Sequence, residues 1–190
     1  AEGTGTDSLT IDASGTTGAN VTLSGVTGGT TALSALTVTG VDIGVFDIGD
    51  ADTVGVSGTT QITATDELTL SGATYKTNAA TYTSASGDKI LLTKGATTTF
   101  TTSDDALSFA TGNLTLSDGN DLVASTSGGA ISALAIGGTS SEDVTLSSTG
   151  GTINTVSVGA IGSADEINTV AITGSSGITL NGNIVTSDAS

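Results

Sequence analysis

The stretch from Asn20 to Gly40, NVTLSGVTGGTTALSALTVTG, contains two short apolar segments separated by a glycine-rich turn. The first segment reads Val21-Thr-Leu-Ser, and the second reads Leu33-Ser-Ala-Leu-Thr-Val. Alternation of apolar and small polar residues is typical of a β-strand that buries one of its faces. Glycine pairs such as the one between these segments mark turns. The stretch therefore predicts two strands joined by a turn.

Copies of both segments recur along the chain. The first, apolar-Thr-apolar-polar, begins at Leu9, Val21, Leu68, Leu114, Val144 and Ile178. The second, apolar-(Ser/Asn)-(Ala/Thr)-apolar-x-apolar, begins at Leu33, Ile131, Ile153 and Ile167. Repetition of one short strand is typical of an array of stacked repeats. We therefore expect a stacked β-structure.

One position of the second segment is polar in every copy. Its residues are Ser34, Ser132, Asn154 and Asn168. If the copies stack in register, these side chains are predicted to form a hydrogen-bonded ladder along the stack. The alternative is that they face solvent.

Composition restricts how an interior could be filled. The 190 residues include 28 glycines and no proline, cysteine, methionine, tryptophan or histidine, and aromatic residues make up only 3%. A globular core of this size normally contains several large aromatic side chains. A narrow interior of Val, Ile, Leu and Ala favours a thin solenoid. We therefore expect an all-β fold, a parallel β-helix that runs through residues 1–190 as one domain; the alternative is two tandem immunoglobulin-like β-sandwiches.

Residues 75–110 are the least regular stretch. They hold four of the five aromatic residues, Tyr75, Tyr82, Phe100 and Phe109, and all three lysines. Two interpretations remain open. Either an insertion or a lateral contact begins here, or this part of the stack is a wider coil that needs bulkier side chains.

Charge restricts the partners. Three lysines stand against 19 acidic residues, so the formal net charge is −16. Binding of nucleic acid or anionic lipid needs a basic surface. No apolar run approaches the length of a membrane-spanning helix. We therefore expect no nucleic-acid partner and no membrane insertion.

Catalytic chemistry has little support in the sequence. Without histidine and cysteine, the common nucleophilic triads are excluded. Carboxylate pairs such as Glu142 and Asp143 are present, but adjacent residues on a strand point to opposite faces. The chain also lacks an arginine that could hold a sugar substrate. We therefore expect no enzymatic activity.

Two acidic turns form the candidate metal site. Their oxygen-bearing residues are Asp47, Asp50 and Asp52 in one turn, and Asp118, Asn120 and Asp121 in the other. Carboxylate and amide oxygens are the ligands that calcium prefers. Neither turn matches an EF-hand loop or the nonapeptide of calcium-binding β-rolls. Calcium is the one cofactor that the sequence suggests, and a solvated turn without metal is the alternative.

The segments at 20–40 and 177–186, the latter reading GITLNGNIVT, resemble the repeats of large bacterial surface exoproteins of the filamentous-haemagglutinin-like, β-strand-repeat type. The resemblance implies a right-handed parallel β-helix that is secreted to the cell surface or the extracellular space. It also implies a structural role in a surface filament, a surface layer or the stalk of an adhesin. The alternative function is an adhesive module that binds glycan or a cell surface, with or without calcium.

Solenoid ends expose strand edges that other strands can join. The sequence contains no recognisable cap for either end of such a stack. The predicted partners are therefore further copies stacked end to end, or neighbouring repeats of a longer chain.

Overall fold

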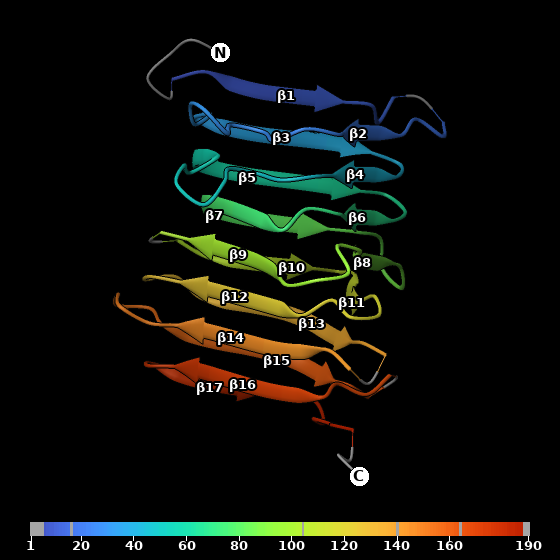
Figure 1. Ribbon diagram of the computed structural model, residues 1–190. Helices are drawn as coiled ribbons and strands as arrows, with labels where there is room; N and C mark the ends of the chain where they lie inside the picture. The colour runs from blue at the N-terminus through green and yellow to red at the C-terminus, as the bar shows by residue number, and fades with distance from the viewer. Residues whose placement is uncertain (1–5, 16, 104, 140, 164, 188–190) are drawn as a thin grey trace.

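The computed structural model describes residues 6–187, apart from positions 16, 104, 140 and 164. Within these residues the fold is all-β, with 17 strands and no helix. The strands pair in parallel and stack as a β-solenoid of about 7 turns, with β1 and β17 at opposite ends (Figure 1). This architecture confirms the predicted parallel β-helix and excludes the tandem sandwiches.

Pairing sorts the strands into three columns that run along the stack. The first column contains β1 (Ser8–Asp12), β3 (Ala35–Gly40), β5 (Val56–Ala64), the second half of β7 (Thr74–Thr83), β10 (Leu107–Ala110), β13 (Ile131–Gly137), β15 (Thr155–Ile161) and β17 (Gly177–Leu180). The second contains β2 (Val21–Leu23), β4 (Ile43–Val45), β6 (Leu68–Leu70), β8 (Lys89–Leu92), β11 (Asn113–Leu116) and the ends of β13 and β15. The third contains the first half of β7, β9 (Thr98–Thr102), β12 (Leu122–Thr126), β14 (Asp143–Ser148) and β16 (Thr169–Gly174), preceded by single bridges at Thr27 and Ile48.

Inward side chains form continuous rows because the pairing keeps its register along the stack, apart from a register shift between Val56 and Thr59 of β5. One row of the first column runs through Leu9, Leu36, Thr60, Ala80, Leu107, Ile131, Val156 and Ile178. The next row of that column runs through Ile11, Val38, Ile62, Tyr82, Phe109, Ala133, Val158 and Leu180. A row of the second column runs through Val21, Ile43, Leu68, Ile90, Leu114, Ile136, Ile161 and Ile184. Each coil is therefore covered by the same rows of the coils on either side.

Coil length varies although the rows are continuous. Ser8 pairs with Ala35, 27 residues later, whereas Thr60 pairs with Ala80, only 20 residues later. The difference in length lies in the corners, the turns that join the strands of a coil. At Gly49, for example, φ is 74° and an added Cβ would lie 2.6 Å from the carbonyl oxygen of Thr53, so the corner needs glycine.

The predicted ladder of Ser34, Ser132, Asn154 and Asn168 is wrong. Ser132 pairs with Ser157 and not with Asn154, and Asn168 precedes a strand of the third column. Copies of the repeated segment thus begin at different rows of the coil. Hydrogen bonds between outward side chains form elsewhere: Ser132 Oγ donates to Ser108 Oγ at 3.0 Å.

Four aromatic side chains of the irregular stretch pack together inside the stack. The ring centroids of Tyr75 and Phe100 lie 4.7 Å apart in a stacked pair, and those of Tyr82 and Phe109 lie 5.7 Å apart in a second stacked pair. Phe100 meets Phe109 edge-on at 5.0 Å. All four are buried, and the strands that carry them pair within the same columns as the other strands. In the next coil, both aromatic rows continue with alanine.

The two tyrosine hydroxyls in this cluster differ in their partners. The Tyr75 hydroxyl accepts a hydrogen bond from the Gly72 N–H and donates one to the Val45 carbonyl, both at 3.0 Å. The Tyr82 hydroxyl is buried without a hydrogen-bond partner. Burial raises the pKa of both phenols, so both stay protonated at neutral pH.

Phenylalanine substitutions separate these two roles. Tyr82→Phe removes a buried hydroxyl that has no partner, so we expect the free energy of unfolding to stay the same or to rise by up to about 1 kcal/mol. Tyr75→Phe leaves two backbone groups without a partner, so we expect a loss of about 1–3 kcal/mol. Urea unfolding of both variants measures the difference. A larger loss in Tyr82→Phe than in Tyr75→Phe would contradict this account of the cluster.

Candidate functional site

Short hydroxylated side chains line the outer face of the first column. Its central outward row contains Thr10, Thr37, Gln61, Thr81, Ser108, Ser132, Ser157 and Thr179. No member of this row carries a charge. This row therefore offers hydroxyl and amide groups and no carboxylate.

The first predicted calcium turn is held by its own carboxylates. Asp47 Oδ1 accepts a hydrogen bond from the backbone N–H of Thr74 in the next coil at 2.8 Å. Asp50 Oδ1 accepts from the N–H groups of Asp52 and Thr53 at 2.9 and 2.7 Å. These backbone hydrogen bonds, from Thr53 and then from Asp52, lower the pKa of Asp50. Asp52 itself is exposed.

The second predicted calcium turn links three coils. Asn120 is buried, and its Oδ1 accepts a hydrogen bond from the Gly95 N–H of the preceding coil at 3.2 Å. Asp121 Oδ1 accepts one from the Asp143 N–H of the following coil at 2.9 Å. Asp118 is exposed. Two of the three predicted ligands thus bind backbone groups of neighbouring coils.

The oxygen atoms of both turns have a structural use that the sequence did not indicate. Asp47, Asp50, Asn120 and Asp121 accept hydrogen bonds from backbone N–H groups. Across the part of the chain that the structure describes, no three histidine, cysteine, aspartate or glutamate side chains converge as metal ligands. Calcium binding at these turns stays a prediction.

Glu142 is the one buried carboxylate among the described residues. Its Oε1 accepts hydrogen bonds from the Gly119 N–H at 3.1 Å and from the hydroxyls of Thr139 and Ser141 at 2.6 and 2.8 Å. Its Oε2 accepts one from the Thr139 N–H at 2.5 Å. A Cβ added at Gly138 would lie 2.5 Å from Oε2, so a side chain at this position would displace the carboxylate.

The surroundings of Glu142 change its ionisation. Burial alone would raise the pKa of Glu142, but the hydrogen bonds donated by Thr139 and Ser141 outweigh burial and lower it to about 2. The carboxylate is therefore ionised at neutral pH and serves as a fixed acceptor that joins its corner to the preceding coil.

Acid should weaken the fold through Glu142. Because the pKa is about 2 in the folded state and 4.5 for an ordinary glutamate, its contribution is complete above pH 4.5 and is lost as pH falls toward 2. We expect Glu142→Gln to lower the melting temperature at pH 7 and to flatten its decline across this pH range. Thermal unfolding between pH 2 and pH 7 measures both effects, with Glu166→Gln, at an exposed position, as the control. Equal pH profiles for Glu142→Gln and the unaltered chain would refute the assignment.

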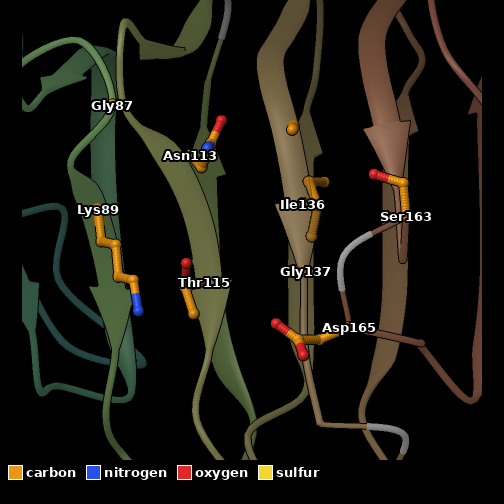
Figure 2. A pocket seen from close by; sticks show the side chains of 9 residues that line it. Gly87, Lys89, Asn113, Thr115, Ile136, Gly137, Ser163 and Asp165 are labelled. Carbon is orange, nitrogen blue, oxygen red and sulfur yellow. The ribbon is translucent and has the colours of Figure 1, made fainter.

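A shallow groove of about 200 Å³ lies on the outer face of the second column (Figure 2). It crosses four successive coils, from Lys89 of β8, through Asn113 and Thr115 of β11 and Gly137 of β13, to Asp165 in the loop after β15. Gly137 contributes no side chain, which leaves room between the polar groups. Lys89 and Asp165 approach from opposite sides (Figure 2).

The lining of this groove combines polar groups with apolar surface from Ala135 and Ile136. It presents an ammonium group, a carboxylate, an amide and hydroxyls, and no aromatic residue. A saccharide needs such donors and acceptors, whereas drug-like apolar ligands need hydrophobic walls. Lys89 belongs to the irregular stretch for which a lateral contact was one interpretation. Asn113 and Asp165 join it only through stacking, and no signal in the sequence placed them together.

Comparison with protein-family models, curated proteins and solved structures gave no match to this chain. The likeness to filamentous-haemagglutinin-like exoproteins therefore rests on the repeated sequence segments alone. Among the described residues, none belongs to a helix long and apolar enough to cross a membrane.

Proposed function

We propose that the protein is a structural β-solenoid of the bacterial cell exterior that forms part of a surface filament, a surface layer or an adhesin stalk. One observation carries this proposal: the inward rows, which are mostly aliphatic, and the parallel pairing continue through the described coils. A stack in which each coil stabilises its neighbours forms an elongated body without a separate core for a catalytic site. Such a body serves as a spacer or a fibre unit.

The polar groups support the same proposal. Carboxylates at the corners accept hydrogen bonds that join coils, as Asp47, Asp121 and Glu142 do. Side chains engaged in this way hold the stack together and are not arranged around a reacting atom. We therefore propose that the protein is not an enzyme.

An exterior location is supported by composition and by the sequence resemblance. The chain has no cysteine, which is compatible with an oxidising environment. Its net charge of −16 keeps the sides of neighbouring rods apart and favours solubility at high local concentration.

Immunogold labelling tests the location and the role together. An antibody raised against the purified chain should label the outside of intact producing cells, in lines or patches that extend from the surface. An antibody against a cytoplasmic protein is the control and should label only sectioned cells. Label confined to the cell interior would refute the proposed function.

A glycan-binding adhesive module is the second candidate, and the groove between Lys89 and Asp165 is the observation that favours it. Binding of the chain to immobilised oligosaccharides should fall at least about tenfold, or about 1.4 kcal/mol, in Lys89→Ala and in Asp165→Ala. Lys94→Ala, at an exposed lysine outside the groove, should bind unchanged. Repeating the measurement with calcium and with a chelator tests the predicted calcium dependence. If no oligosaccharide binds, or if the groove variants bind normally, this candidate fails.

A further inference from the structure

The last coil leaves its inward rows uncovered. Ile178, Leu180 and Ile184 are 47%, 48% and 39% exposed. Val156 and Val158, one coil earlier in the rows of Ile178 and Leu180, are 0% and 1% exposed. Among the residues that the structure describes, none forms a further layer on β17, and its inward side chains present an aliphatic surface.

The first described coil begins the same three rows. Leu9 and Ile11 of β1 are only partly buried, and they begin the two rows of the first column that end in β17. Val21 begins the row of the second column that ends at Ile184. If a second copy stacks with the same spacing and register as successive coils of one chain, its β1 lies on β17 and all three rows continue.

The two end strands carry the same sequence segment. β1 contains Leu9-Thr-Ile-Asp12, and Ile178-Thr-Leu-Asn181 begins in β17. In this register apolar side chains meet apolar side chains, and threonine meets threonine. Asp12 of one copy then lies beside Asn181 of the other, so a carboxylate acceptor faces an amide that can donate a hydrogen bond.

Charge is depleted at both ends. Residues 167–187 contain no Asp, Glu, Lys or Arg, in a chain with 19 acidic residues. Residues 6–34 contain only two charged side chains, Asp7 and Asp12. Depletion of charge is typical of the core of an interface between protein chains. The carboxylates of the first coil of one copy would meet no like charge on the last coil of another. The acidic sides of two copies, in contrast, repel each other.

We propose that the two ends of the stack form a joint, in which β1 of a second copy pairs in parallel with β17. This inference rests on the proposed structural function and names its partner, another copy of this chain. A head-to-tail contact of this kind does not close on itself, so copies add into an open filament. With strands about 4.8 Å apart, the eight layers of the first column would add roughly 38 Å of filament per copy.

Sedimentation and electron microscopy of the full chain at rising concentration test the joint. We expect association that increases with concentration and thin filaments with an axial repeat near 38 Å, from about 4.8 Å per layer. Leu180→Lys places an ammonium group on an apolar row and should weaken association at least about tenfold. Gln61→Lys makes the same charge change at an exposed outward position in the middle of the stack, away from both ends, and should change association less than about threefold. Circular dichroism checks that both variants fold.

A charge exchange tests the proposed register. Asn181→Asp sets two carboxylates side by side across the joint and should weaken association about tenfold. Adding Asp12→Asn to that variant restores one amide and one carboxylate with their places exchanged, and should recover most of the association. The two positions lie at opposite ends of a single stack, so a rescue requires two copies (Figure 1).

Three results would overturn the joint: a wild-type chain that stays monomeric at every concentration, filaments that Leu180→Lys leaves unchanged, or a charge exchange without rescue. These results are separate from the surface labelling. Labelled cell surfaces with a monomeric chain would keep the structural function and reject the joint. Filaments of the purified chain, with label only inside cells, would keep the joint and reject the proposed function.

Discussion

Parallel backbone pairing between successive coils is the interaction on which the rest of the structure depends. It keeps one register from Leu9 to Ile178, so side chains that are far apart in sequence fall into the same inward rows. Burial follows from that alignment, because each layer is covered by equivalent positions above and below. Aliphatic residues suffice for most layers. Only the middle of the stack uses aromatic side chains, where Tyr75 and Phe100 stack with their rings nearly parallel.

At the corners, the turns that join the strands of a coil, backbone groups lose their partners because the chain leaves the ladder of hydrogen bonds between strands. Buried N–H groups without a partner are costly. Carboxylates have only acceptor atoms, which suits them to unpaired N–H groups. Glu142 accepts from the backbone of Gly119 and Thr139, and Asp50 accepts from the backbone of Thr53. The acidic composition therefore has a structural component in addition to its effect on solubility.

The fold class and many of the strands could be predicted from the sequence, because alternation and turn residues are local signals. The parallel stack could be predicted as well, because the composition provides too few large aromatic side chains to fill a globular core. Register could not, since pairing partners such as Ser132 and Ser157 are chosen by the length of the intervening corner and by the burial of a whole coil. The hydrogen-bond donors around Glu142 could not be predicted from the sequence either. In the sequence it is one half of an acidic pair, and only the folded corner brings its donors together.

The spacing between paired residues of successive coils ranges from 27 residues to 19, while the advance along the axis remains one strand spacing. The molecule is thus periodic in space and aperiodic in sequence. A residue inserted at a corner leaves the layers above and below in place. A residue inserted within a strand turns the following side chains of that strand from the interior to the surface. Length changes are therefore tolerated at the corners, and a stack of this kind can keep its shape long after its coils have ceased to align with one another by sequence.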